Sequence, residues 1–230
     1  MHHHEEHFES PAFVRDIVIG MADGLTVPFA LAAGLSGAVD TSGIILTAGI
    51  AEIAAGSIAM GLGGYLAGRT EVDHYAAELE REYIETEIFP EKEKEEVREV
   101  LEEYGVSESS SKMIADEMAK DKDKWVKFMM RFELGLEKPD EKRAAKSAFN
   151  IGAAYIVGGL VPLAPYIFIP AVHEALLVSI IVTLIALFIF GFLKAKAIGE
   201  QQWKGALKTT LIGALAAGAA FGIARLIQST

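Results

Sequence analysis

The chain has 230 residues, of which 51% are hydrophobic and 23% charged, and its mean hydropathy is +0.30. Between Arg69 and Lys146 lie 23 of the 32 acidic residues and 15 of the 21 basic ones, a segregation that excludes a simple soluble enzyme, a disordered chain and a collagen-like repeat. The net charge of −11 argues against nucleic acid as a partner and favours cations, and the absence of cysteine excludes disulfides and thiolate metal sites.

The N-terminal segment, residues 1–12, is acidic and rich in histidine. It lacks the basic segment that opens a secretory signal peptide, and we expect it to form a cytosolic tail. Its histidines could bind metal weakly or be the remnant of a purification tag. They are His2, His3, His4 and His7.

Five stretches are long and apolar enough to cross a bilayer, whose hydrocarbon core of ~30 Å needs about 20 apolar residues in a helix. The alternative for each stretch is a buried helix of a soluble core, but five such stretches in one chain favour membrane spans. Glycines four residues apart, which predict close helix contacts, occur in three of them. The stretches are 13–38, 42–68, 147–172, 175–193 and 203–228, and the pairs are Gly20 and Gly24, Gly64 and Gly68, and Gly218 and Gly222.

Lys and Arg flank these spans asymmetrically, which predicts their orientation. If the N-terminus is cytosolic, Arg225 is the one basic residue that flanks a span on the opposite side. We therefore expect the C-terminus to face an organelle lumen or the cell exterior. The cytosolic flanks then hold Arg15, Arg69, Arg143, Lys146, Lys194, Lys196 and Lys204.

Two acidic residues, Asp23 and Glu52, each lie about ten residues inside an apolar span, which is about 15 Å deep in a helix. A carboxylate at mid-membrane costs on the order of 2.5–3.5 kcal/mol, so such residues are functional by default. No Lys or Arg lies at this depth, which points to a cation or a proton as the counter-charge. The alternative is a protonated acid that only bonds a neighbouring helix.

Met60 lies on the same helix face as Glu52, two turns further along. Gly56 between them predicts room for an ion, although a methionine in a helix is as often a packing residue. On the first span, Pro28 leaves the carbonyl of Gly24 without its helical hydrogen bond, which makes an oxygen ligand available beside Asp23.

The segment 69–142, between the second and third spans, predicts a helical insert on the cytosolic side. The second span continues as one helix to Phe89, where Pro90 stops it. Further helices are predicted over 91–104, 107–120 and 121–134, with Ser107 as N-cap of the middle one and Ser110 as the alternative.

Acidic side chains recur three or four residues apart in this insert, so they share helix faces. Like charges so placed repel one another unless a cation binds among them, and carboxylate oxygens suit magnesium, calcium, manganese and ferrous iron. The alternative, which spacing alone favours, is a solvated, charge-rich hairpin. No EF-hand loop, phosphate-binding loop or catalytic motif occurs, so no enzyme class is supported. The recurring residues are Glu78, Glu82, Glu85, Glu93, Glu96, Glu99 and Glu102, and the pair Met129 and Glu133.

Two motifs resemble those of a known family. The segment Asp23–Ala38, DGLTVPFALAAGLSGA, resembles the first-span signature of the vacuolar iron transporter family, and Ala48–Leu66 resembles its second span. The acidic insert is similar to the cytosolic metal-binding domain of the plant members. The resemblance implies a homodimer in the vacuolar membrane that exchanges cytosolic ferrous iron, and in some members manganese, for luminal protons. Cobalt and zinc are further candidate substrates.

The resemblance also implies roles for individual residues, by their positions in the motifs. In the membrane it assigns the ion path to Asp23, Glu52 and Met60. In the insert it assigns cytosolic metal binding to Glu82, Glu85, Glu93, Glu96, Met129 and Glu133.

Residues and resemblance together predict an all-α, polytopic membrane protein with five transmembrane helices and a cytosolic helical metal-binding insert. We expect its partners to be membrane lipid, divalent metal ions, protons and a second copy of the chain. The alternatives are a membrane-anchored cytosolic metal sensor or storage protein without transport, and a structural scaffold. The expected parts are a cytosolic tail (1–12), spans one and two (13–68), the metal-binding domain (69–142) and spans three to five (143–230), with the C-terminus luminal.

Overall fold

The structure, a computed structural model, describes residues 11–228. The four N-terminal histidines lie outside this range. The described residues form helices joined by turns, with no strand among them, as the all-α prediction requires. They divide into two compact units, the insert unit Ala67–Arg143 and a bundle unit made of the described residues on either side of it.

Within residues 11–228 five helices are long and apolar enough to cross a membrane, which confirms the number of predicted spans. The second of them continues well beyond its apolar part, as predicted, and ends just before Pro90. The third contains two prolines and the first contains one. They are α1 (Pro11–Ser36), α2 (Ser42–Ile88), α6 (Arg143–Phe168), α7 (Val172–Ala197) and α8 (Gln202–Gln228).

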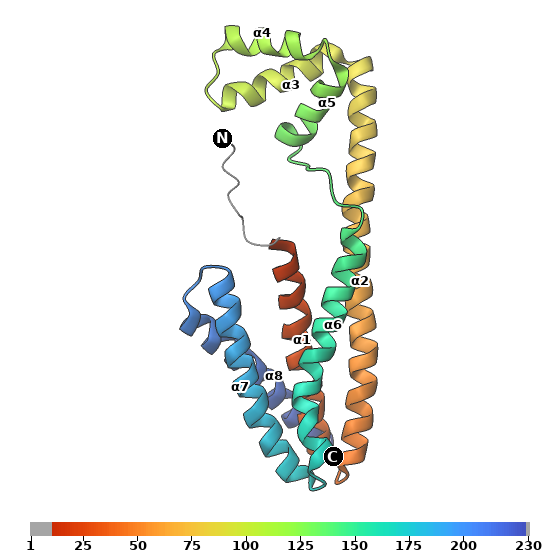
Figure 1. Cartoon of the computed structure of the whole chain (residues 1–230), viewed down its shortest axis with the longest axis vertical. Coiled ribbons are helices and arrows are strands. Elements are labelled where there is room, and N and C mark those ends of the chain that lie inside the picture. Colours follow the sequence, from red (N-terminus) through yellow and green to blue (C-terminus); the bar gives the residue numbers. More distant parts are fainter. Residues whose placement is uncertain (1–10, 229–230) are drawn as a thin grey trace, which may run out of the picture. The chain divides into compact units, whose positions relative to one another are not determined.

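In the bundle unit α1 packs against α7 and α8 on one side and against α6 on the other (Figure 1). A Cβ on Gly20 would overlap the carbonyl oxygen of Ile151 in α6, so the two backbones touch there as the glycine spacing predicts. At Gly218 and Gly222 a Cβ would meet no described atom within 4 Å, so that pair makes no such contact among the described residues, and its contact with a second copy of the chain stays a prediction.

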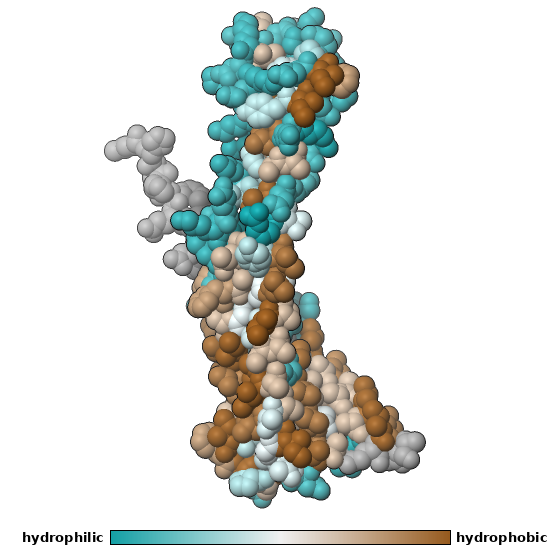
Figure 2. Space-filling view, turned by 90° about the vertical axis from the view of Figure 1, so that its right-hand side faces the viewer, coloured by the Kyte–Doolittle hydropathy of each residue, from teal (hydrophilic) through white to brown (hydrophobic). Residues whose placement is uncertain are grey.

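The outer surface of the bundle unit is largely apolar. Ile58 and Leu215 are 70% and 72% exposed, and Figure 2 shows hydrophobic residues over much of the bundle and hydrophilic ones over the insert unit. Large exposed apolar patches are unfavourable in water. The bundle surface therefore suits a lipid environment.

The insert unit holds three short helices, α3 (Pro90–Glu103), α4 (Glu108–Met118) and α5 (Lys122–Phe128), and a π-helical turn, η1 (Met129–Glu133). Ser107 is the N-cap residue of α4, as expected, although its side chain makes no capping hydrogen bond. The predicted single helix 121–134 is instead divided into α5 and η1. An apolar core of Val97, Ala115, Trp125 and Met129 holds these pieces together.

Candidate metal-transport site

Glu52 lies half-buried on α2, and a tyrosine from another helix holds its carboxylate. The Oη of Tyr155, in the middle of α6, donates a hydrogen bond to Oε1 of Glu52. The second oxygen, Oε2, is buried and makes no hydrogen bond with any described residue. Because a buried carboxylate oxygen without a partner is costly, Glu52 keeps an acceptor position that a cation or a proton can fill.

Asp23 lies half-buried on α1, at the level where α1 touches the same part of α6. A Cβ on the next residue, Gly24, would overlap the backbone of Tyr155. Tyr155 therefore contacts α1 through its backbone and α2 through its phenol. It links the helix that carries Asp23 to the helix that carries Glu52.

The face of α2 that carries Glu52, Gly56 and Met60 differs from our expectation in one respect. A Cβ on Gly56 would lie 2.5 Å from the Oη and Cζ of Tyr155. The room predicted between Glu52 and Met60 is therefore taken by the tyrosine ring. Spacing along one helix cannot report what a neighbouring helix places against it.

A polar contact also joins α1 and α6, about two helical turns away from Asp23 and Tyr155. Asp16 is only 3% exposed, and Ser147 Oγ donates a 2.9 Å hydrogen bond to its Oδ1. Asp16 and Asp23 are seven residues apart, and Ser147 and Tyr155 eight, so each pair shares one helix face. The α1–α6 contact thus carries polar groups at two levels.

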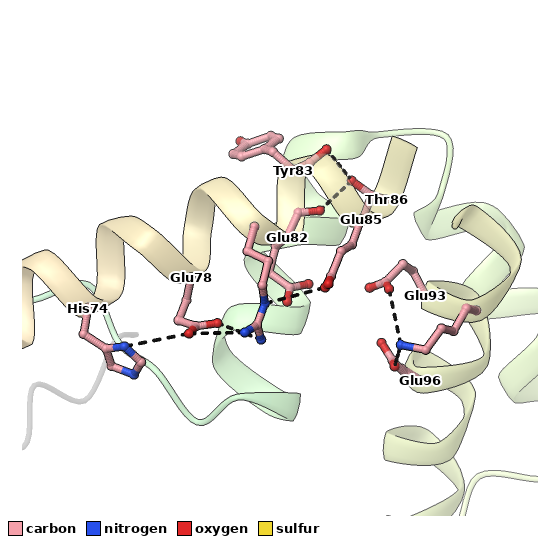
Figure 3. A network of polar contacts seen from close by, with 10 residues as sticks. His74, Glu78, Glu82, Tyr83, Glu85, Thr86, Glu93 and Glu96 are labelled. Carbon is pink, nitrogen blue, oxygen red and sulfur yellow. Dashed lines mark hydrogen bonds and ion pairs between the residues drawn. The ribbon is translucent and has the colours of Figure 1, made fainter. Parts of the chain in front are cut away.

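In the insert unit, acidic residues from α2 and α3 converge (Figure 3). One carboxylate oxygen from each of Glu82, Glu85 and Glu93 lies within 4.8 Å of the other two, the one such group of three among residues 11–228. Glu82 and Glu93 are 2% and 1% exposed. Oxygens around a metal ion at 2.0–2.6 Å are at most about 5 Å apart, so this spacing fits a divalent cation.

The electrostatics of this cluster favour a bound cation. Burial, and then the neighbouring carboxylates, raise the pKa of Glu82 and Glu93 to about 7. Oε2 of Glu82 and both oxygens of Glu93 are buried without a hydrogen-bond partner in the described chain. A divalent ion relieves both costs, because it supplies positive charge and accepts the free lone pairs.

The other predicted insert residues lie in different surroundings. Glu96 pairs with Lys92 at 2.8 Å, and Glu133 stands exposed on η1 although it interacts electrostatically with Glu93 and Glu96. Met129 is fully buried in the apolar core beside Val97 and Trp125. The structure therefore brings together Glu82, Glu85 and Glu93, and it places Met129 among apolar neighbours.

Carboxylates can bind a hard or borderline divalent ion both in the bundle unit, at Asp23 and Glu52, and in the acidic cluster of the insert unit. Neither group of residues resembles a nucleophile–base pair. A model described as the VIT family matches residues 14–225. The chain belongs to the VIT family. The match covers nearly all of the five spans and the whole of the insert unit.

Several curated relatives of this VIT family chain carry the name vacuolar iron transporter. The chain is 53% identical to vacuolar iron transporter 1 of Arabidopsis thaliana over 227 residues, covering 99% of the chain and 91% of that protein. It is 55% identical to vacuolar iron transporter 1 of Eucalyptus grandis, with the same coverage. Protein CCC1 of Saccharomyces cerevisiae is 37% identical over 229 residues, covering 94% of the chain and 70% of that protein.

Sequence reasoning missed Tyr155 and the Asp16–Ser147 pair in this VIT family chain. Tyr155 carried a usable signal, because a tyrosine deep in an apolar span needs a hydrogen-bond partner for its hydroxyl. Nothing in the sequence named that partner as Glu52. Asp16 lies near the end of its span, where an acid is expected to reach water, and gave no comparable signal.

Proposed function

We propose that this chain moves ferrous iron from the cytosol into the vacuole in exchange for protons. The observation that carries the proposal is the state of Glu52, a carboxylate inside an apolar helix with one oxygen held by Tyr155 and the other without a partner. Such a group must bind a cation or a proton in turn, since no basic side chain among the described residues pairs with it. The relatives named vacuolar iron transporters supply the identity of the ion.

In the proposed cycle, metal from a near-neutral cytosol displaces protons from Asp23 and Glu52, and an acidic lumen returns them. Carboxylates bind metal only when deprotonated, so luminal acid releases the ion. A lumen about two pH units more acidic supplies ~2.7 kcal/mol per exchanged proton, at 1.36 kcal/mol per unit. Manganese, cobalt and zinc are further candidate ions for the same ligands.

We also propose the arrangement of the chain in the membrane. The N-terminus and the insert unit face the cytosol and the C-terminus faces the lumen, since seven of the eight basic residues that flank the spans then lie on the cytosolic side. The functional unit is a homodimer. Glu82, Glu85, Glu93, Glu96, Met129 and Glu133 collect the ion before Asp23, Glu52 and Met60 pass it across the membrane.

The test is metal uptake into proteoliposomes that contain a pH-sensitive dye. We expect ferrous iron uptake to raise the internal pH, and an inside-acid gradient to accelerate it. Asp23→Ala should abolish uptake in a folded protein, whereas Glu200→Ala, at an exposed position in the turn after α7, should not. Uptake that moves no protons and ignores the gradient would mean a uniporter, and normal uptake by Asp23→Ala would remove the membrane site.

The acidic cluster of α2 and α3 also suits a metal sensor or store that uses the membrane only as an anchor. The same vesicles separate the two functions. A sensor binds metal to the insert unit at equilibrium but leaves the interior of the vesicle free of it.

A further inference from the structure

An apolar cavity of about 250 Å³ lies between α1, α7 and α8, away from all the metal-site residues above. Phe29, Leu184 and Ala217 are among its walls, and every residue that lines it is apolar. Ala214 and Gly218 line it too and are exposed, so the cavity opens to the outer surface of the bundle unit. A dry cavity that faces lipid admits hydrocarbon, since it offers water no hydrogen-bond partner.

A polar pocket of about 510 Å³ lies at the ends of the same three helices. Ser36, Asp40, His173 and Arg225 line it. Phe221 joins the two spaces, because its ring lines the apolar cavity and lies 5.4 Å from the guanidinium of Arg225. The two spaces lie along the same three helices, the apolar one inside them and the polar one at their ends, and we call them together the groove.

The length of the groove matches one leaflet of a bilayer. From Ala214, near the middle of α8, to Arg225, in its last turn, eleven residues rise by about 16 Å. Half of a hydrocarbon core of ~30 Å is about 15 Å. On α1 and α7 the groove likewise runs from inside the helix to its end, at Ser36 and His173. Its apolar end is therefore near mid-membrane and its polar end at the headgroup level.

We propose that this groove binds one glycerophospholipid with a zwitterionic headgroup. One acyl chain fills the apolar cavity, the phosphate pairs with Arg225, and the headgroup amine pairs with Asp40. A free phosphate has no acyl chain to fill the cavity, and a fatty acid has no cation to pair with Asp40. The groove therefore selects a molecule with an acyl chain, a phosphate and an amine. Because the lipid touches α1, α7 and α8 together, it fastens the last span to the first.

The glycines of α8 provide a matched pair of variants. A Cβ on Gly218 or on Gly222 would meet no described atom within 4 Å, so a side chain can leave the backbone at either position without overlapping a described neighbour. Gly218 lines the cavity and Gly222 does not. Gly218→Leu therefore occupies the acyl-chain space, and Gly222→Leu is its control. Ala214→Leu is a second variant that narrows the same cavity.

The experiment is native mass spectrometry of the full chain in detergent, titrated with dioleoyl phosphatidylethanolamine, dioleoyl phosphatidylglycerol or inorganic phosphate. We expect one phosphatidylethanolamine per chain to be retained, at least about fivefold less of it by Gly218→Leu and Ala214→Leu, and wild-type retention by Gly222→Leu. Arg225→Gln should weaken retention of both lipids. Asp40→Asn should remove the preference for phosphatidylethanolamine over phosphatidylglycerol.

Three results would overturn the proposal. Equal lipid retention by Gly218→Leu and Gly222→Leu would remove the acyl-chain site. Retention of inorganic phosphate in place of lipid, lost in Arg225→Gln, would make the pocket a simple anion site. A change in the mass of the assembly with Gly218→Leu, without a change in lipid, would show that a second copy of the chain covers the groove. None of these readouts depends on iron transport.

Discussion

Tyr155 and Glu52 form a hydrogen bond between α6 and α2, although 103 residues separate them in the chain. The phenol occupies the space beside Gly56 and orients one carboxylate oxygen, which leaves the other as the free acceptor. Tyr155 is thus a positioning residue for the carboxylate that we propose as an ion ligand.

Tyr155→Phe removes this hydroxyl and keeps the ring. A hydrogen bond to a charged group contributes about 1.5–3 kcal/mol, so we expect the apparent affinity for transported metal to fall by about tenfold or more in proteoliposome uptake. Tyr65→Phe, on an exposed position of α2, is the control and should behave as wild type. Unchanged uptake by Tyr155→Phe would mean that the phenol serves packing alone.

The buried acids of the insert unit allow a comparison of two double variants that lose the same formal charge. The double substitution Glu82→Gln and Glu93→Gln keeps side-chain shape but removes the two buried charges. We expect at least one manganese ion fewer per chain in titration calorimetry, and slower but measurable metal uptake because the membrane site remains. Glu91→Gln with Glu95→Gln removes the same charge from exposed positions of α3 and should leave binding unchanged. Equal binding by both double variants would favour the solvated hairpin.

The raised pKa values of the cluster predict that metal binding depends on pH near neutrality. With Glu82 and Glu93 at pKa about 7, protons compete with metal below that value, since only the ionised groups bind. Competition by one such proton weakens manganese binding by about tenfold between pH 7.5 and pH 6. Titration calorimetry in two buffers with different heats of ionisation measures both the affinity and the protons released. A constant affinity over this range would place the pKa values near 4.5 instead.

The α1–α6 contact predicts opposite outcomes for two glycine-to-alanine substitutions. Gly24→Ala forces a Cβ into the backbone of Tyr155, and overpacking of this kind costs about 1–3 kcal/mol. Gly63→Ala, on α2, meets no described atom within 4 Å and should be neutral or stabilising, because alanine favours helix by up to about 1 kcal/mol over glycine. Thermal unfolding in detergent, followed by circular dichroism, measures both. Equal midpoints for the two variants would contradict the close approach.

The sequence alone determined the properties that depend on short segments. The five spans follow from apolar length against a bilayer of nearly constant thickness, and they were predicted within a few residues of their ends. The insert helices end near Gly105 and Gly135, as predicted, because both residues adopt the positive φ that glycine permits. Asp23 and Glu52 could also be identified from short segments, because an acidic residue within an apolar span is recognisable without knowledge of its partner.

Only the tertiary structure decided which of these residues meet. Equal glycine spacing gives a backbone contact at Gly20 and Gly24 and, within residues 11–228, none at Gly218 and Gly222, because contact depends on what another helix presents at that level. Of the acids that share helix faces in the insert unit, three converge in one group, with Glu93 brought from α3 to Glu82 and Glu85 on α2. Sequence periodicity predicts which side chains share a face of one helix. The tertiary packing decides which residues of another helix lie opposite that face.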